Sequence, residues 1–205
     1  MKLGGKAILE ALDNGIWKMY RGDKLLNPEQ YYSLVGPNSI DVSLSKHFLS
    51  QRIPNNNPTG IIDPWDQESL YWKSFEINEK KGYVLHPGKF ILSCTRERLE
   101  CNAPLIIDGK EHYFVQGYDG RSTMGRLGVA SHVTAGFGDY GFQGAFTLEL
   151  FCQEHPTLLR PEMKIGQIYV EHTHKPLEYK GAYTKKEHYS KPQPPKIGPH
   201  RFKVL

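Results

Sequence analysis

The segment from Asp119 to Phe151 constrains the fold of this chain most, because it combines seven glycines and two arginines with one acidic residue, Glu149, that lies inside an otherwise apolar strand. A charged group is rarely buried without a partner, and a glycine costs backbone entropy unless a turn or a close approach requires it. Packing alone in a small domain gives little reason for this mixture. We therefore interpret the segment as a site that binds a phosphorylated ligand at one end and performs carboxylate chemistry at the other.

Composition indicates a turn-rich β protein. The 205 residues suggest one domain with a sizeable core, and they include 20 glycines, 14 prolines, 12 tyrosines and 9 phenylalanines. Aromatic residues favour strands, and turn signals recur at short intervals. Because only one clear helix is predicted, the pattern favours an all-β fold, an antiparallel sandwich or barrel.

Hydrophobic spacing predicts the order of the elements. Residues 6–13 form a short amphipathic helix that Asn14 and Gly15 can end, followed by a polar connection over 23–38. Strands are predicted within 39–48, 83–94, 111–118, 145–152 and 164–171, with a turn at His86-Pro87-Gly88 and a loop over 55–66. Residues 1–175 make the expected domain. The basic, Tyr- and Pro-rich residues 176–205 make an arm that is ordered only against another surface.

Charge, cysteine content and hydropathy exclude several classes of protein. The formal charge of +4 is too small and diffuse for a nucleic-acid-binding protein, although it suits a small anionic ligand. The three cysteines, Cys94, Cys101 and Cys152, are an odd number without short paired spacing, which indicates free thiols. No apolar run could span a bilayer, and the N-terminus lacks a signal-type core. We expect a soluble cytoplasmic protein without a nucleic-acid or membrane partner.

A turn rich in hydrogen-bond donors lies at the start of the central segment. Residues 121–126 contain two arginines, Ser122 and Thr123. Hydroxyl groups, the free N–H groups of a short helical turn and guanidinium forks can all bind phosphate oxygens. Ser122 is placed to cap a helical turn over residues 122–126. The alternative is an ordinary capped turn with two solvated arginines, and the spacing does not separate the two interpretations.

Two carboxylates are candidates for proton transfer. Alternation in the strand places Glu149 on the face opposite Leu148 and Leu150. In a pocket with little water, this carboxylate could shuttle protons, whereas the alternative is a strand glutamate in solvent. Asp139 lies in a Gly-rich turn, where a side chain that bonds its own backbone is the alternative interpretation.

Zinc chemistry has no support in the motifs. Zinc-dependent nucleobase deaminases carry H-x-E followed by P-C-x-x-C, and this chain has neither. Its nine histidines form no H-E-x-x-H motif and no His/Cys cluster in the sequence. A deaminase with this sequence would therefore work without a zinc-bound water.

Four ordered blocks resemble the dCTP deaminase family of the dUTPase-like superfamily. The string GRSTMGRLGVASHVTAGFGDYGFQGAFTLELF is similar to the family pattern GRSSLARLGL-x-x-HVTAHRIDPGWxGxIxLEFYN. The blocks SIDVSLSKHF, VLHPGKFILSCTRERLE and LRPEMKIGQIYVE also occur in family order. Together these blocks are spread over residues 39–171.

The resemblance implies a distorted jelly-roll or β-barrel subunit with a short N-terminal helix and a C-terminal arm. It also implies a homotrimer with active sites at subunit interfaces. The implied reaction converts dCTP and water into dUTP and ammonia, with Mg²⁺ bound to the substrate triphosphate and no zinc. Glu149 falls on the catalytic glutamate of the family, the general base for attack of water on C4 of cytosine.

The resemblance assigns the remaining site residues by position. Ser122 and Arg126 match the pair that holds the water and the glutamate, and the backbone at Ala135 matches a contact with that water. The implied nucleotide-binding positions are Arg121, Ser122, Thr123, Met124, Gly125, Arg126, Asp139, Thr147, Leu148, Glu149, Tyr179 and Lys186. Asp139 would lie near the sugar. The backbone of Thr147 and Leu148 would form hydrogen bonds with the base. Tyr179 and Lys186 would belong to a lid over the triphosphate.

Departures from the family pattern keep two other functions open. Gly136 replaces the usual histidine and resembles the G-x-x-D pattern of dUTPases, whose catalytic base aligns with Asp139. A dUTPase or a bifunctional enzyme is therefore an alternative, although dUTPases typically carry an apolar residue at Glu149. The second alternative is a regulator that binds deoxynucleotides without catalysing a reaction.

Overall fold

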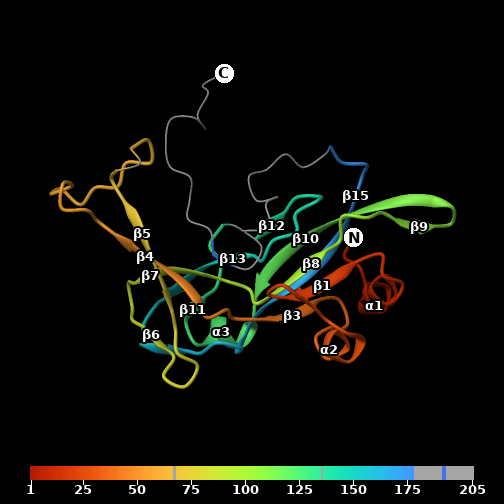
Figure 1. The fold of residues 1–205 in the computed structure, drawn as a ribbon, viewed down its shortest axis with the longest axis horizontal. Coiled ribbons are helices and arrows are strands. Elements are labelled where there is room, and N and C mark those ends of the chain that lie inside the picture. The colour runs from red at the N-terminus through yellow and green to blue at the C-terminus, as the bar shows by residue number, and fades with distance from the viewer. Residues whose placement is uncertain (67, 135, 178–190, 193–205) are drawn as a thin grey trace.

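The computed structural model describes residues 1–66, 68–134, 136–177 and 191–192, and it shows a mainly β protein with three short helices (Figure 1). The helices are α1 (Gly5–Asp13), α2 (Pro28–Tyr32) and α3 (Ser122–Arg126). The strands are β1 (Lys18–Arg21), β2 (Lys24–Leu25), β3 (Ile40–Ser43), β4 (His47–Arg52), β5 (Tyr71–Glu76), β6 (Tyr83–Leu85), β7 (Phe90–Cys94), β8 (Glu97–Glu100), β9 (Leu105–Ile107), β10 (Lys110–Gly120), β11 (Val129–Ala130), β12 (Phe137–Gly138), β13 (Thr147–Cys152), β14 (Thr157–Leu159) and β15 (Lys164–Thr173). The predicted mainly β fold class is confirmed.

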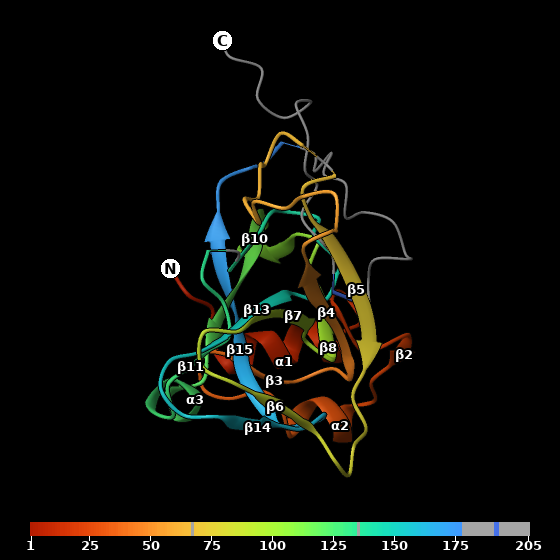
Figure 2. The ribbon, with the colours of Figure 1, turned by 90° about the vertical axis from the view of Figure 1, so that its left-hand side faces the viewer.

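Two five-stranded antiparallel sheets make up most of the domain. One has the order β12-β10-β15-β3, with β9 added to β10, and the other has the order β11-β13-β7-β4-β5. Figure 2 shows β10 and β15 along one side of the molecule and β4 and β5 along the other. Two small sheets, β2-β1-β8 and β14-β6, complete the pairing within the described residues.

The long pair β10 and β15 depends on glycines that admit aromatic rings. A Cβ atom at Gly166 would lie 2.2 Å from the hydroxyl oxygen of Tyr118, and one at Gly117 would lie 2.3 Å from the Tyr169 ring. The Tyr118 hydroxyl donates a hydrogen bond to Oγ of Ser131 over 2.8 Å. Burial raises the pKa of Tyr118, so this hydroxyl stays protonated and keeps its donor role.

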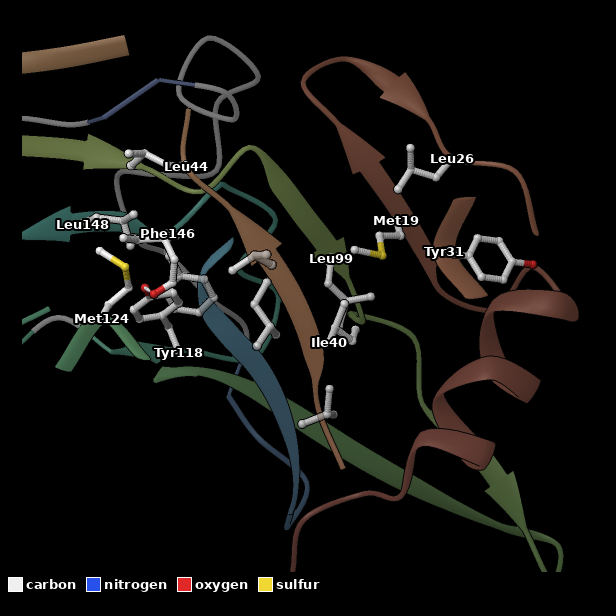
Figure 3. Packing of buried hydrophobic residues seen from close by; sticks show 14 of the residues in the cluster. Met19, Leu26, Tyr31, Ile40, Leu44, Leu99, Tyr118, Met124, Phe146 and Leu148 are labelled. Carbon is white, nitrogen blue, oxygen red and sulfur yellow. Dashed lines mark hydrogen bonds between the residues drawn. The ribbon is translucent and has the colours of Figure 1, made fainter. Parts of the chain in front are cut away.

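The buried core attaches the donor-rich turn to the rest of the domain. Figure 3 shows the side chain of Met124, from α3, beside Tyr118, Phe146 and Leu148. Met124 is the buried residue of α3, so one residue in this short helix packs inward while its neighbours stay at the surface. A second group in the same core joins β1, β3, β8 and α2 through Met19, Leu26, Tyr31, Ile40 and Leu99 (Figure 3).

A buried carboxylate joins three strands that are distant in the sequence. Glu97 of β8 is fully buried and accepts hydrogen bonds from the backbone N–H of Ser43 over 2.7 Å and from Nε of Arg21 over 2.9 Å. The Ser43 hydroxyl also donates to it. Because buried charges require partners, this cluster fixes β1, β3 and β8 relative to one another.

The local predictions hold for the helix at the N-terminus but miss the second helix. The helix predicted over 6–13 is α1, and Asn14 and the left-handed Gly15 end it as expected. The connection predicted over 23–38 instead contains β2 and α2. Helix α2 begins with Pro28 and a reciprocal capping box between Asn27 and Gln30, a signal that the sequence carries.

Several other segments can be compared directly. The strand predicted within 39–48 is interrupted after Ser43, where β3 ends, and β4 begins at His47. The strands around His86-Pro87-Gly88 are confirmed as β6 and β7, and the three cysteines are buried thiols that no disulfide joins. In the described part of the chain, no helix is long and apolar enough to cross a membrane. Most of the C-terminal arm, with Tyr179 and Lys186, lies outside the described residues, so the arm and the domain boundary stay predictions.

We predict that Glu97→Ala destabilises the fold by about 3 kcal/mol, because it leaves Arg21 and the Ser43 amide without their buried acceptor. Urea unfolding at a fixed protein concentration measures this loss. The matched control is Glu76→Ala, which removes an exposed partner of Lys46 and should change stability far less. Equal losses for the two variants would contradict the role assigned to Glu97.

Candidate functional site

Strand β13 presents Glu149 on a half-buried face. Leu148 and Leu150 are fully buried, whereas Thr147 and Glu149 alternate with them and are half-buried. This confirms the predicted alternation of the strand. The neighbouring strand β7 pairs with β13 so that Glu149 lies opposite Leu92, which fixes the position of the carboxylate along the sheet.

Two consecutive backbone amides hold the carboxylate of Glu149. The N–H of Val133 donates to Oε2 over 2.6 Å, and the N–H of Thr134 donates to the same oxygen over 2.8 Å. The Thr134 hydroxyl lies 3.4 Å from Oε1. Hydrogen bonds to an ionised acceptor are shorter and stronger than neutral ones, so this arrangement fixes both the position and the orientation of the carboxylate.

The segment that carries these amides is anchored on both of its flanks. Before it, β11 pairs with β13 at Cys152 and Phe151, so the chain runs back beside the strand of Glu149. Ser131 follows β11, is buried, and accepts the hydrogen bond of the Tyr118 hydroxyl. The ring of the next residue, His132, packs edge-on against the Tyr118 ring, with the ring centroids 5.4 Å apart.

Gly136, on the other flank, is required by close packing. The Gly136 carbonyl accepts a hydrogen bond from the Tyr118 N–H over 2.7 Å. A Cβ atom at this position would lie 2.8 Å from Cδ2 of His132 and 2.8 Å from the Tyr118 carbonyl oxygen. A larger side chain at this position would therefore have to displace the His132 ring or the backbone beside it.

Helix α3 exposes most of the predicted phosphate-binding turn. Its exposed residues are Ser122, Thr123, Gly125 and Arg126. The prediction that Ser122 caps this helix is wrong, because the N-cap is Arg121 and no side chain caps the helix. The helix spans residues 122–126 as predicted, but Ser122 occupies its first turn and not the cap position. The buried Met124 side chain leaves only its backbone available to a ligand.

One buried donor of Arg121 has no hydrogen-bond acceptor among the described residues. Its Nη1 atom is buried and has no hydrogen-bond partner among the described residues, although Asp41 Oδ2 lies 3.8 Å away. The same Asp41 oxygen is 2.6 Å from Nζ of Lys164, which is its closer partner. A buried guanidinium nitrogen without an acceptor is costly, and a bound anion would satisfy it.

The structure brings together only part of the predicted site. In the described chain, neither Ser122 nor Arg126 forms a hydrogen bond or an ion pair with Glu149. Asp139 is exposed in the turn after β12, where its carbonyl accepts from the Phe142 N–H over 2.9 Å. Ala135 lies outside the described residues. The two amide donors to Glu149 were not predicted from the sequence, because backbone N–H groups have no residue signature.

Metal-binding side chains do not gather around these residues. Within residues 1–66, 68–134, 136–177 and 191–192, no group of three or more His, Cys, Asp or Glu side chains is placed to hold a metal ion. A metal that accompanies a nucleotide would be held chiefly by the oxygens of its phosphates.

The chain is similar to known proteins over most of its length. The family described as dCTP deaminase-like matches residues 13–173. A protein of Corynebacterium kroppenstedtii named dCTP deaminase, dUMP-forming, is 36% identical over 169 residues, which cover 82% of this chain and 80% of that protein. A protein of Salinispora arenicola with the same name is 40% identical over 148 residues, which cover 72% of this chain and 71% of its own length.

A solved structure shares the fold. The crystal structure of 2'-deoxycytidine 5'-triphosphate deaminase from Agrobacterium tumefaciens superposes with a TM-score of 0.54 at 19% identity. The match covers 82% of this chain but only 47% of that one, so the chain spans about half the length of that neighbour. The family match extends over most of the chain and includes β13, α3 and the segment that holds Glu149. The chain belongs to the dCTP deaminase-like family.

Proposed function

We propose that this protein hydrolyses dCTP in two steps, first deaminating the base and then releasing pyrophosphate, so that the product is dUMP. The observation that carries the proposal is the half-buried Glu149 carboxylate, held by the Val133 and Thr134 amides in a family of dCTP deaminases. Relatives named as dUMP-forming support the second step. This replaces the dUTP product expected from the sequence with the bifunctional alternative.

Glu149 is the proposed general base of the deamination. Its carboxylate takes a proton from a water molecule as the oxygen attacks C4 of cytosine. It then returns protons to N3 and to the departing amino group, so that dCTP and water give dUTP and ammonia. The amides of Val133 and Thr134 hold the carboxylate in place throughout, which removes the need to reorganise it during the reaction.

The turn around α3 is the proposed binding site for the triphosphate. The exposed Ser122, Thr123 and Arg126 offer hydroxyl and guanidinium donors, and the unsatisfied Nη1 of Arg121 can donate a hydrogen bond to an anionic oxygen. Mg²⁺ enters with the nucleotide and neutralises part of the phosphate charge. Thr147 and Leu148 contribute backbone groups to the base, as the family resemblance implies.

Asp139 is the proposed base of the second hydrolysis. The residue is exposed at the end of β12, close in sequence to the Gly136 carbonyl that bonds Tyr118. There its carboxylate can activate a water molecule for attack on the phosphate next to the sugar. Water and dUTP then give dUMP and pyrophosphate. Gly136 is the residue at which this chain resembles the dUTPase pattern.

A complete site requires two subunits in this proposal. Arg126 is exposed, and no ion pair among the described residues joins it to Glu149. A homotrimer in which Ser122 and Arg126 of one subunit reach Glu149 of the next would complete the site that the family resemblance implies.

We predict that Glu149→Gln lowers kcat for ammonia release from dCTP by about 100- to 10,000-fold while the dCTP Kd changes little, because the amide keeps the shape but cannot accept the proton. A coupled ammonia assay and isothermal titration with dCTP measure the two quantities. Glu154→Gln, at an exposed glutamate beyond β13, is the control and should keep full activity. Equal rates for Glu149→Gln and wild type would remove Glu149 from the mechanism.

The product assay separates the two steps. Wild-type protein should convert dCTP and Mg²⁺ into dUMP, pyrophosphate and ammonia, whereas Asp139→Asn should release ammonia and accumulate dUTP. Chromatography of the nucleotides distinguishes these outcomes, and Asp108→Asn in the exposed β9–β10 turn serves as the control. Accumulation of dUTP by wild type would reject the second step. Binding of dCTP without ammonia would indicate the regulator without turnover.

Shared active sites can be tested by mixing inactive variants. Glu149→Gln and Arg126→Gln should each be inactive alone, but trimers reassembled from an equal mixture should recover about a quarter of wild-type activity, since that share of interfaces combines both intact residues. Activity is measured after dissociation and reassembly, with mass-resolved chromatography to verify the trimer. A mixture as inactive as its components would show that each chain builds its site alone.

A further inference from the structure

We propose that His112 and His172 form a binding site for a divalent transition-metal ion such as Cu²⁺, Ni²⁺ or Zn²⁺. Nδ1 of His112 and Nε2 of His172 lie 3.1 Å apart, although the residues are 60 positions apart in the sequence. The site shares no residue with the proposed nucleotide site, and its existence does not depend on the proposed reaction.

The two imidazoles belong to a firmly paired stretch of backbone. Strands β10 and β15 pair with Phe114 opposite His172, and continuing the same register places His112 opposite His174. On its other edge β10 pairs with β9, where His112 lies opposite Leu105. Because His112 is paired with β9 and the next residue, Tyr113, is paired with β15, the His112 backbone has little freedom to move away from His172.

Aromatic rings of the core pack against His172. The buried Phe114 ring meets the His172 ring edge-on with the centroids 5.7 Å apart, and Trp17 packs edge-on against Phe114 at 5.4 Å. The backbone N–H of His172 also donates to the Met1 carbonyl over 3.1 Å. The orientation of the His172 ring is therefore tied to the core.

The distance between the nitrogens suits a shared metal ion. Without metal, the N–H of one ring donates a hydrogen bond to the nitrogen of the other. A metal ion would take the place of that hydrogen and accept a lone pair from each neutral ring. Metal–nitrogen bonds of about 2.0–2.1 Å in tetrahedral geometry place two nitrogens about 3.3 Å apart, close to the spacing found here. Imidazole ligands favour zinc, copper and nickel, whereas Mg²⁺ prefers oxygen ligands.

The surroundings leave the remaining coordination positions open. A hollow of about 390 Å³ lies over the pair and is also lined by His174, Lys110 and Lys175. The His174 ring lies 6.3 Å from the His172 ring, too far to act as a third ligand in this conformation. Water or a small anion would complete the coordination sphere, and the two lysines would favour an anion there.

Isothermal titration of the full chain, without a purification tag and after treatment with EDTA, tests the proposal with CuCl₂, NiCl₂ and MgCl₂. We expect one Cu²⁺ per chain, weaker binding of Ni²⁺, and no displacement of Cu²⁺ by Mg²⁺. His112→Gln and His172→Gln should each weaken Cu²⁺ binding at least about tenfold. His155→Gln, at an exposed histidine remote from the pair in sequence, should bind as wild type does.

Unchanged Cu²⁺ affinity and stoichiometry in either His112→Gln or His172→Gln would overturn the proposal. Circular dichroism checks that each variant is folded, and electron paramagnetic resonance of the Cu²⁺ complex provides an independent measurement. Two coordinating imidazole nitrogens in wild type and fewer in a folded variant support the site, whereas identical spectra contradict it. Ammonia release from dCTP should be the same in these variants as in wild type, so failure of the metal site and failure of the proposed reaction give different results.

Discussion

The account of this protein depends on the pair of amide hydrogen bonds from Val133 and Thr134 to the Glu149 carboxylate. A glutamate on a half-buried strand face can turn toward solvent or toward its neighbours, and these two donors select one orientation. Backbone donors are well suited to the task because their direction is set by the fold rather than by a rotamer. A base that is already oriented needs no further ordering when substrate arrives.

The fold produces this arrangement by holding the segment from Ser131 to Gly136 at both ends. The Tyr118 hydroxyl bonds Ser131, and the Tyr118 N–H bonds the Gly136 carbonyl, so one residue of β10 serves both ends. Tyr118 in turn fits against β15 only because residue 166 is glycine. The position of the amides beside Glu149 thus follows from close packing on a different sheet. A conservative substitution at Tyr118 or Gly166 should therefore change the rate of the proposed reaction, although neither residue belongs to the proposed nucleotide site.

Residue patterns within short segments of the sequence predicted the structural features that form between residues close together in the chain. The helix over 6–13, the alternation around Glu149 and the helical turn over 122–126 depend on periodicity and turn chemistry, and all three are confirmed. Helix α2 was missed because residues 23–38 were assigned to a polar connection, although the Asn-Pro-Glu-Gln start of the helix carries a capping signal. The cap at Ser122 was placed wrongly because propensity cannot fix a helix boundary to one residue.

Contacts between distant segments could not be predicted in the same way. The cluster of Glu97 with Arg21 and Ser43 combines three strands, and nothing in the ERLE sequence distinguishes this buried glutamate from a surface one. The amide donors to Glu149 have no side-chain signature at all. The family resemblance implied a role for Glu149 and named Ser122 and Arg126 as its supports, whereas the structure shows the Val133 and Thr134 amides bonded to it.

The most direct measurement of the central claim is a crystal structure with Mg²⁺ and a non-hydrolysable dCTP analogue bound. The account predicts that C4 of the cytosine lies within reach of the Glu149 carboxylate through one water molecule, while the Val133 and Thr134 amides still donate to that carboxylate. A bound nucleotide whose base lies away from Glu149, with that side chain turned to bulk solvent, would contradict it.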